Sequence, residues 1–204
     1  EYARKKGISI EMAARELRYN WFEEMRLKKK MDYIVVGHHA DDLAETIFIN
    51  ICRGTGIKGL TGIRPVKDKI LRPLLSRSRD EIIAYIEKNQ RGYRTDSTNN
   101  SLDYVRNKIR HTIIPVCKEI NPSFLNTVQE NCDTMKDVEQ IYRYGIEQLK
   151  ASVISEENGE ILIDIQKTVN TPAPYTLLFE ILRPYGFNST QIDDILNSCD
   201  AIPG

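Results

Sequence analysis

The stretch "DYIVVGHHADDLAETIFINICRGTG", residues 32–56, decides the fold of this chain. Its consecutive strand formers "YIVV" predict a buried strand, because strands of a parallel sheet are covered on both faces and are therefore continuously apolar. Behind them Leu43, Ile47 and Ile51 recur at helical spacing, so a helix is expected directly after the strand. Two histidines and three carboxylates follow the strand within ten residues, at its carboxyl end.

The rest of the first half alternates helices with one further strand. Ser9 is expected to cap an amphipathic helix that extends to about Lys30, and "KILRPLL", residues 69–75, predicts a second short strand. Ser78 and Glu81 form a capping box for a helix over "RDEIIAYIEKN", and "YVRNKIRHTIIP" predicts another helix. This order predicts an α/β domain in which helices cross over a parallel sheet, and with two strands the doubly wound sheet is partial.

Two loops are expected between these elements. "GTGIKG", residues 54–59, has the GxGxxG spacing of a dinucleotide-binding loop, but it follows a helix rather than a strand and is therefore interpreted as a turn. "RTDSTNNS", residues 94–101, is interpreted as a second loop. Pro73 indicates that the second strand ends there or lies at a sheet edge.

The second half of the chain differs in character. Asn121 and Pro122 are typical of a helix start, and a long acidic helix is expected there, followed by a turn at "EENGE", a short strand at "ILIDI" and two more helices. We expect a domain boundary near residues 119–122. The prediction is an α/β domain over residues 1–120 and a smaller, mainly helical domain over residues 121–204.

The formal net charge of zero hides an asymmetry between the two halves. Residues 1–118 carry 24 Lys and Arg against 15 Asp and Glu, whereas residues 119–204 carry 5 against 14. The basic half suits a polyanion, although a mixed solvated surface explains the same composition. Four scattered cysteines indicate reduced thiols, and no apolar run approaches the roughly 20 residues that span a bilayer, so a cytoplasmic protein without membrane contact is expected.

The polar cluster after the first strand is the first candidate site. Ligands of open parallel sheets bind outside the carboxyl ends of the strands. A structural explanation is open for each residue alone, because first-turn carboxylates stabilise the helix dipole by roughly 0.3–1 kcal/mol and histidines suit a hydrogen-bonded turn. The spacing matches no zinc motif, so no permanent metal site is expected. Taken together, the cluster favours a site made of His38, His39, Asp41, Asp42 and Glu45.

Arginines form a second candidate group. Arg106 and Arg110 lie four residues apart and share one face of a predicted helix. Such a pair suits phosphate contacts, although ion pairs with Asp96 or Asp103 explain it equally well. The candidate phosphate-binding residues are Arg72, Arg106, Asn107 and Arg110.

Five segments, taken in order, resemble the tRNA(Ile)-lysidine synthase family. They are "MAARELRYNWF", "GHHADDLAETIFINICRGTGIKGLTGIRP", "LRPLLSRSRDEIIAYI", "TDSTN" and "RNKIRHTIIP". The resemblance covers residues 3–120 in detail, and residues 121–204 resemble the helical second domain of that family. It implies the adenine-nucleotide α-hydrolase fold of the N-type ATP-pyrophosphatases. The SGGxDS-like phosphate loop of the family does not occur in these 204 residues, so we expect an internal piece that supplies half of an active site and is inactive by itself.

The resemblance also implies a reaction. ATP adenylates the C2 oxygen of the wobble cytidine, position 34, of a CAU-anticodon tRNA(Ile), and the amine of L-lysine then displaces AMP to give lysidine, which allows AUA decoding. Mg²⁺ is expected to accompany ATP, and a homodimer is left open. The lysine must be held by carboxylates, and the adenylated base is electron-poor. These two requirements together explain why acids, imidazoles and arginines meet at one strand end.

By the same resemblance, catalytic roles fall on residues that contact phosphate or base or that handle lysine and cytidine, namely Arg18, His38, Asp42 and Glu45. Roles in substrate or tRNA binding fall on Arg15, His39, Asp41, Arg72, Arg106, Asn107 and Arg110.

Two other functions are weighed against this one. A tRNA thiolase of the same superfamily would need suitably placed cysteines, and the four cysteines here are scattered. A non-catalytic RNA-binding module would not place carboxylates at the strand end, because they repel RNA.

Overall fold

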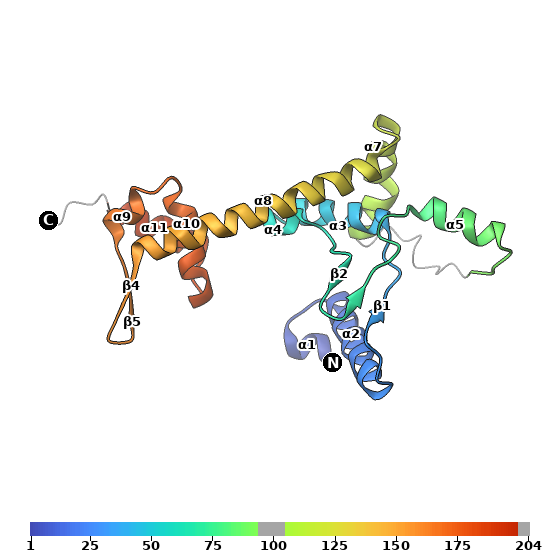
Figure 1. The fold of residues 1–204 in the computed structure, drawn as a ribbon, viewed down its shortest axis with the longest axis horizontal. Helices are drawn as coiled ribbons and strands as arrows, with labels where there is room; N and C mark the ends of the chain where they lie inside the picture. The colour runs from blue at the N-terminus through green and yellow to red at the C-terminus, as the bar shows by residue number, and fades with distance from the viewer. Residues whose placement is uncertain (94–104, 200–204) are drawn as a thin grey trace. The chain divides into compact units, whose positions relative to one another are not determined.

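The computed structural model describes residues 1–93 and 105–199. It divides into two compact units, Glu1–Lys136 and Asp137–Gly204, and the division falls within the long helix α8, Phe124–Val153. The predicted boundary at residues 119–122 lies just before α8 begins. Each unit is described here by itself, and Figure 1 shows the elements of both.

The first unit opens with two helices, α1 (Tyr2–Lys6) and α2 (Ile10–Lys28). Ser9 has extended backbone and its hydroxyl oxygen accepts a hydrogen bond from the Met12 N–H at 3.1 Å, which satisfies one of the free donors of the first turn of α2. The predicted helix and its cap are confirmed.

The sheet of this unit is small and mixed. Its order is β1 (Ile34–Val35), β3 (Ile70–Leu71) and β2 (Val66–Lys67), with β1 parallel and β2 antiparallel to β3. Sequence analysis missed β2, which has no apolar pattern. Asp68 turns the chain between β2 and β3 with a positive φ of 54°, a conformation that Asp tolerates better than most residues.

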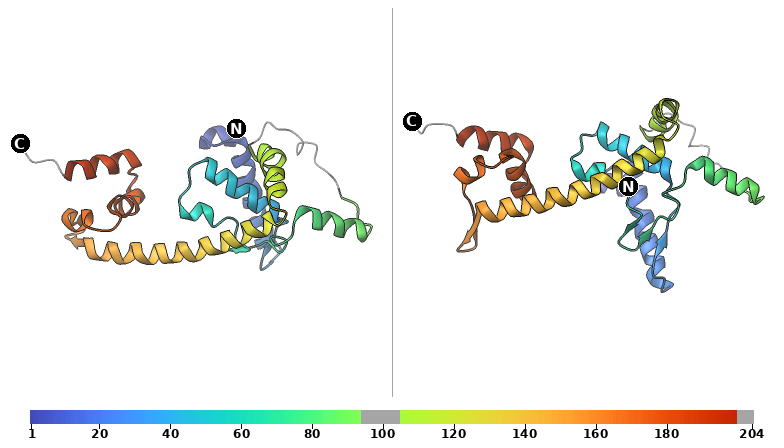
Figure 2. Two further views of the ribbon diagram at one scale, coloured as in Figure 1. Left: turned by 90° about the horizontal axis from the view of Figure 1, so that it is seen from above. Right: turned by 45° about the horizontal axis from the view of Figure 1, so that its top comes forward.

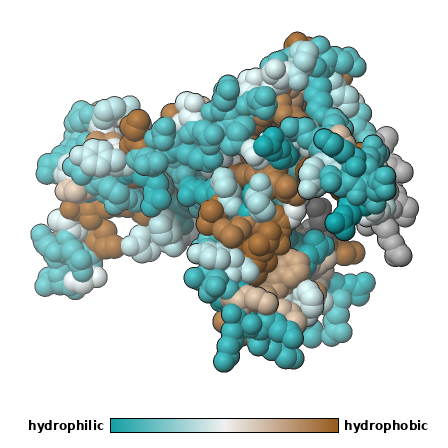
Figure 3. Space-filling model, turned by 45° about the vertical axis from the view of Figure 1, so that its right-hand side comes forward, coloured by the Kyte–Doolittle hydropathy of each residue, from teal (hydrophilic) through white to brown (hydrophobic). Residues whose placement is uncertain are grey.

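The prediction of a buried first strand was wrong. Only two residues of "YIVV" are strand, and the side chain of Val35 is 65% exposed. Among the described residues β1 pairs on one edge only, so its second edge and this side chain are uncovered. In Figure 3, apolar residues gather on the lower part of the face shown, where α1, α2 and the three strands lie in Figure 1.

Helix α3 (Ala40–Cys52) follows β1 as predicted, and its apolar side packs into the main core. The glycine-rich segment behind it, expected to be a turn, contains a short helix, α4 (Ile57–Leu60). Helix α5 (Arg79–Lys88) starts at the predicted capping box, in which Ser78 accepts from the Glu81 N–H and Glu81 accepts from the Ser78 N–H.

The helix predicted over "YVRNKIRHTIIP" consists of three parts. These are α6 (Val105–Lys108), a π-helix η2 (Ile109–Ile113) and α7 (Ile114–Ile120). The Ile114 N–H donates to the Ile109 carbonyl, five residues back. Pro115 has no N–H to donate, which disturbs the regular ladder at this point. The loop predicted over residues 94–101 lies outside the described residues.

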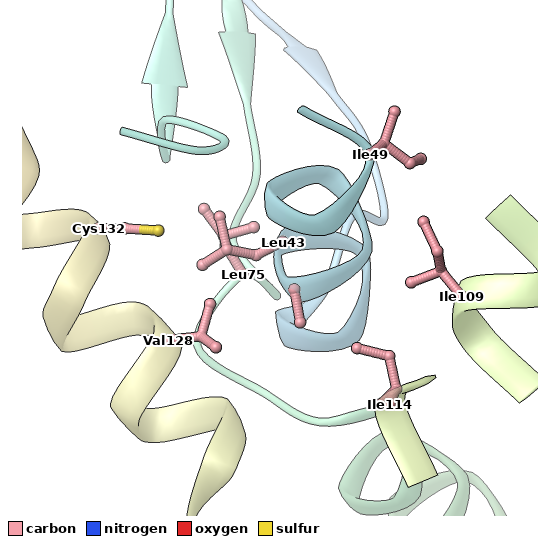
Figure 4. Close-up of a cluster of buried hydrophobic side chains, with 8 residues drawn as sticks. Leu43, Ile49, Leu75, Ile109, Ile114, Val128 and Cys132 are labelled. Atoms are coloured by element: carbon pink, nitrogen blue, oxygen red, sulfur yellow. The ribbon is translucent and has the colours of Figure 1, made fainter. Parts of the chain in front are cut away.

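The core of the first unit surrounds α3. Figure 4 shows Leu43 and Ile49 of α3 meeting side chains from the loop after β3, from the segment η2–α7 and from the first half of α8. Gly62 has a positive φ of 66°, and a Cβ there would lie 2.4 Å from Leu43, so glycine is required by both conformation and space. The buried members of this core are Leu43, Ala44, Ile49, Leu75, Ile109, Ile114, Val128 and Cys132.

The second unit is mainly helical. The end of α8 leads into a hairpin of β4 (Ile154–Glu157) and β5 (Glu160–Ile163), and then into α9 (Ile165–Val169), α10 (Pro174–Leu182), a 3₁₀ turn η3 (Arg183–Tyr185) and α11 (Ser189–Cys199). Figure 2 shows the last three helices gathered at the C-terminal end of α8. The core here is made of Val153, Leu177 and Ile181.

Two details of this half differ from expectation. Asn121 is the C-cap of α7 rather than the N-cap of α8, which starts at Phe124. Its carboxamide oxygen accepts from the Ser123 N–H at 2.9 Å. Strand β4 was not predicted because "ISEE" is polar and exposed; its pairing depends on the turn at Asn158 and Gly159, both with positive φ.

No helix in the described part of the chain combines the length and the apolar character needed to cross a membrane.

Candidate functional site

The candidate site is built on the first turn of α3. The His39 N–H donates to the carboxylate of Asp42 at 3.0 Å, and the Ala40 N–H donates to the Arg77 carbonyl at 2.8 Å. Asp42 therefore fixes the start of its own helix, as the structural explanation of a first-turn acid requires. The hydrogen bond from Ala40 to Arg77 connects the start of α3 to the loop in front of α5, and this contact helps to fix the position of the polar cluster.

Glu45 lies one turn further along α3 and is completely buried. Arg110 contacts both of its carboxylate oxygens, with Nε 2.6 Å from Oε1 and Nη2 3.1 Å from Oε2. Arg106 adds a third contact, Nη1 to Oε2 at 3.2 Å. The hydrogen bonds from Glu45 raise the pKa of Arg110 above its usual value. A buried carboxylate needs such compensation, because removing a charge from water costs several kcal/mol.

The same pairs change the interpretation of two predicted phosphate contacts. Arg106 and Arg110 were expected to bind RNA phosphates or to pair with Asp96 or Asp103. They pair instead with Glu45, which is more than sixty residues away in sequence. Asp96 and Asp103 lie outside the described residues. The predicted role of Glu45 in lysine binding would require these arginine pairs to open.

Asp41 points away from Asp42, toward α5 and α7. Its Oδ1 accepts from the Lys118 ammonium at 2.8 Å, and its Oδ2 accepts from the Arg79 N–H at 2.8 Å. Burial alone would raise the pKa of Asp41, but the contacts with His39, Lys118 and this N–H hold it well below its usual range. Asp41 thus joins three helices, and its predicted role in substrate binding stays a prediction.

The two histidines have opposite pKa shifts. Burial lowers the pKa of His38, and nearby arginines lower it further although Asp42 opposes them. Burial would also lower the pKa of His39, but the surrounding carboxylates raise it instead; its ring nitrogens lie 3.6 Å from Asp41 and 3.5 Å from Asp42. His38 is therefore the neutral imidazole of the pair near pH 7, whereas His39 favours the charged form.

A cavity of about 420 Å³ opens between α2 and α3. Six of the predicted site residues line it: Arg15, Arg18, His38, Asp42, Arg72 and Arg106. A neighbouring hollow beside β1 shares Arg15, Arg18, His38 and Asp42 with it. The structure thus brings together residues from four separate segments of the sequence.

Not all of these side chains are open to the cavity. Arg72 is 7% exposed and donates through Nη1 to the Arg64 carbonyl at 2.8 Å, so it is partly a structural residue. Its Nε and the Nδ1 of His38 are buried without a hydrogen-bond partner. Asn107 is buried. Arg18 has no hydrogen-bond or ion-pair partner in residues 1–93 and 105–199, which leaves its guanidinium available.

Lys118 and Arg53 belong to the surroundings of the site but were missed by sequence analysis. Lys118 pairs with Asp41, and Arg53 lines the cavity at the end of α3. Arg53 follows "INIC" and precedes the glycine-rich segment, so its position at a helix end was a usable signal. No pattern links Lys118 to Asp41. Within the described residues, no group of three or more His, Cys, Asp or Glu side chains is arranged to hold a metal ion.

The fold defines an α/β domain, and its cavity lies at the carboxyl end of a parallel strand pair, the place where open parallel sheets bind ligands. Residues 1–117 match the family model of the PP-loop domain, and residues 156–204 match the model of the TilS substrate binding domain. The chain belongs to the PP-loop domain family.

Known relatives narrow the comparison. The chain is 48% identical over 204 residues to the tRNA(Ile)-lysidine synthase of Bacteroides thetaiotaomicron, which covers 100% of this chain and 47% of that protein. The chain is 45% identical over 205 residues to the tRNA(Ile)-lysidine synthase of Porphyromonas gingivalis strain W83, and this match covers 100% of this chain and 44% of that protein. It is 33% identical over 178 residues to the tRNA(Ile)-lysidine synthase of Bacillus subtilis, and this match covers 85% of this chain and 38% of that protein. The chain therefore spans somewhat less than half the length of these relatives.

A solved structure also matches in part. The U34-tRNA thiolase NcsA from Methanococcus maripaludis, with its iron–sulfur cluster, has a TM-score of 0.49 and 19% identity, over 60% of this chain and 42% of that one.

Proposed function

We propose that this chain forms part of a tRNA(Ile)-lysidine synthase. The reaction joins L-lysine to C2 of the wobble cytidine of a CAU-anticodon tRNA(Ile) and consumes ATP. The observation that carries the proposal is the cavity in which three side chains meet: Arg18, which has no side-chain partner among the described residues, His38, whose pKa is lowered, and the carboxylate Asp42. The relatives named tRNA(Ile)-lysidine synthase support it.

The cationic side of the cavity fits a nucleotide. Attack of the C2 oxygen on the α-phosphorus of ATP expels pyrophosphate, so negative charge builds up on the leaving pyrophosphate and needs a positioned cation. Arg18 supplies an open guanidinium on α2. The buried, unpartnered Nε of Arg72 and Nδ1 of His38 line the same cavity and lack the partners that a polar ligand would provide. Mg²⁺ would accompany the phosphates of ATP.

The acidic side fits an amine. The lysine ε-amine reaches the site as an ammonium ion, which can bind the Asp42 carboxylate where it lines the cavity, 3.7 Å from Nη2 of Arg110. It must then lose a proton before its nitrogen attacks C2, after which the C2–O bond breaks and AMP leaves. His38 is positioned to take this proton, because its lowered pKa keeps the imidazole neutral.

The buried acid Glu45 acts through its neighbours. By binding Arg106 and Arg110 it fixes the segment α6–η2 against α3, and Arg106 at the same time lines the cavity. Glu45 is thus a positioning residue in this proposal, while Asp42 contacts the amine. Such an enzyme acts in the cytoplasm, on tRNA and with cellular ATP.

The test uses the full-length protein, a transcript of CAU-anticodon tRNA(Ile), ATP and isotopically labelled lysine. Mass spectrometry of the wobble nucleoside should show one added lysine with loss of one water, and only when ATP is present. A transcript in which the wobble cytidine is replaced by uridine serves as the control and should remain unmodified. Incorporation of sulfur, or no change to the cytidine, would contradict the proposal.

A further inference from the structure

The cavity between α2 and α3 extends well beyond the residues assigned to the reaction. On the α3 side it is lined at Asp42, Thr46, Asn50 and Arg53, at intervals of three or four residues. These positions fall on one face of a helix, and eleven residues correspond to about 16 Å along its axis. The wall is therefore long enough for a ligand larger than the single base that reacts near Asp42.

The two ends of this wall differ in charge. Asp42 marks one end, whereas Arg53 at the other end is exposed and follows the last turn of α3. Beyond Asp42, the lining side chains that the structure describes include no acid, and Met12, Ile49 and Ile63 add apolar surface to the lining. Apolar side chains together with a cation suit a base and the phosphate attached to it.

Most polar groups along the wall are already engaged. The Thr46 hydroxyl donates to the Asp42 carbonyl at 2.8 Å, and the Asn50 amide donates to the Gly59 carbonyl at 2.9 Å. Arg15 lies over the ring of Tyr19, 5.0 Å from its centroid.

Two guanidinium groups remain without such contacts. In the part of the chain that the structure describes, the guanidinium groups of Arg18 and Arg53 make no hydrogen bond or ion pair. Arg18 lies on α2 and Arg53 follows the end of α3, and both line the same cavity. Unlike Arg106, which is held by Glu45, each is open to a ligand.

We propose that Arg53 binds a phosphate of the RNA strand adjoining the nucleotide that reacts. The inference rests on the proposed function and extends it: Arg18 serves the reacting nucleotide, and Arg53 holds the neighbouring phosphodiester. The cavity then recognises a stretch of single-stranded RNA rather than an isolated base. Arg53 supplies position and affinity, and it takes no part in bond making.

The test compares Arg53→Gln and Arg53→Lys in the full-length protein with Arg91→Gln. Arg91 is an exposed arginine that lines neither the cavity nor the neighbouring hollow beside β1. Binding of the CAU-anticodon stem-loop RNA is measured over a salt series. Loss of one phosphate contact should weaken binding roughly three- to tenfold and reduce the log–log salt slope by about 0.7, the value for single strands. Arg53→Lys should retain the slope because it retains the charge, and Arg91→Gln should change neither quantity.

The two proposals fail in different ways. If the wild-type protein adds no lysine to the tRNA, the proposed function is wrong. If it does add lysine but Arg53→Gln binds the stem-loop with the wild-type affinity and slope, Arg53 is not a phosphate contact and this inference is overturned. Thermal unfolding of each variant shows whether the protein is folded, and Arg53→Glu is a second variant that should weaken binding further by repelling the phosphate.

Discussion

Each of the two units is stabilised internally by a different kind of interaction. In the unit of residues 1–136, buried Asp41, Glu45 and Arg72 lie beside the apolar core, and the sheet has only two-residue strands. In the unit of residues 137–204, the described core is aliphatic. The described part of the second unit buries one charged side chain, Glu139, against these three in the first unit. Because burying a charge costs free energy of desolvation, the first unit depends more on ion pairing for its stability.

Breaking the buried charge cluster should have the largest effect on stability. Glu45→Gln leaves Arg106 and Arg110 facing a neutral group, and we expect a loss of about 3–5 kcal/mol in the free energy of unfolding. Glu180→Gln in the second unit is the matched control. Within the described residues its carboxylate accepts one hydrogen bond, from the Tyr142 hydroxyl, so the loss should stay below about 1 kcal/mol. Equal losses in urea unfolding would remove the contrast between the units.

The second prediction separates chemistry from capping at Asp42. In Asp42→Asn the side-chain oxygen can still accept from the His39 N–H, so the unfolding free energy should fall by less than about 1 kcal/mol. Lysidine formation should fall on the order of a hundredfold, which corresponds to roughly 2.7 kcal/mol in the barrier, because a neutral amide cannot hold the ammonium ion. Mass spectrometry of the wobble nucleoside gives the yield. A folded variant with normal yield would leave Asp42 as a helix cap alone.

The third prediction concerns pH and the Lys118–Asp41 pair. The pKa of Asp41 is depressed in the folded state, so its carboxylate contributes stability above the ordinary pKa of about 4. This contribution is lost as the pH falls through the folded-state pKa. Lys118→Met should therefore reduce the unfolding free energy by about 2 kcal/mol at pH 7 and by nearly as much at pH 3, because the folded pKa of Asp41 lies well below its usual range; the loss should shrink only at more acidic pH.

The control for that pair is Lys136→Met. Lys136 pairs with the largely exposed Asp133, so its loss should cost under about 1 kcal/mol and depend little on pH above 5. Unfolding of both variants in urea at several pH values distinguishes the two outcomes. A Lys118→Met loss that stays the same as the pH falls through the folded pKa of Asp41 would show that packing of the lysine stem, not its charge, is responsible.

The smallest effect is expected in the second unit. Burial and the hydrogen bond to Glu180 raise the pKa of Tyr142 to about 12. A raised pKa means that the stabilising contribution is present below about pH 10, the ordinary value, and is lost as the pH rises through 12. Tyr142→Phe should cost about 1 kcal/mol at pH 7, measured by urea unfolding. A loss as large as that of Glu45→Gln would place a critical polar contact in this unit as well.

Local signals in the sequence predicted the elements that depend on neighbours along the chain. The spacing of Leu43, Ile47 and Ile51 identified α3, and Ser78 with Glu81 located the start of α5 within one residue. Strands β2 and β4 were missed because they are short and polar and form only when a partner strand is already in place.

The site was predicted where its residues are adjacent and missed where they are distant. The polar cluster at residues 38–45 and the arginines of the cavity were identified by their grouping and by family resemblance. The pairing of Lys118 with Asp41 joins residues 77 positions apart, and no periodicity encodes it. For the same reason, sequence alone could not show that Glu45 binds Arg106 and Arg110.

The π-helix η2 has a consequence for how this region can vary during evolution. It separates Arg106, which contacts Glu45, from Lys118, which contacts Asp41. Each residue added to or removed from a helix rotates everything beyond it by about 100°. Both ends of the segment meet α3 only at its present length. Related sequences should therefore accept substitutions between residues 106 and 118 far more readily than insertions or deletions.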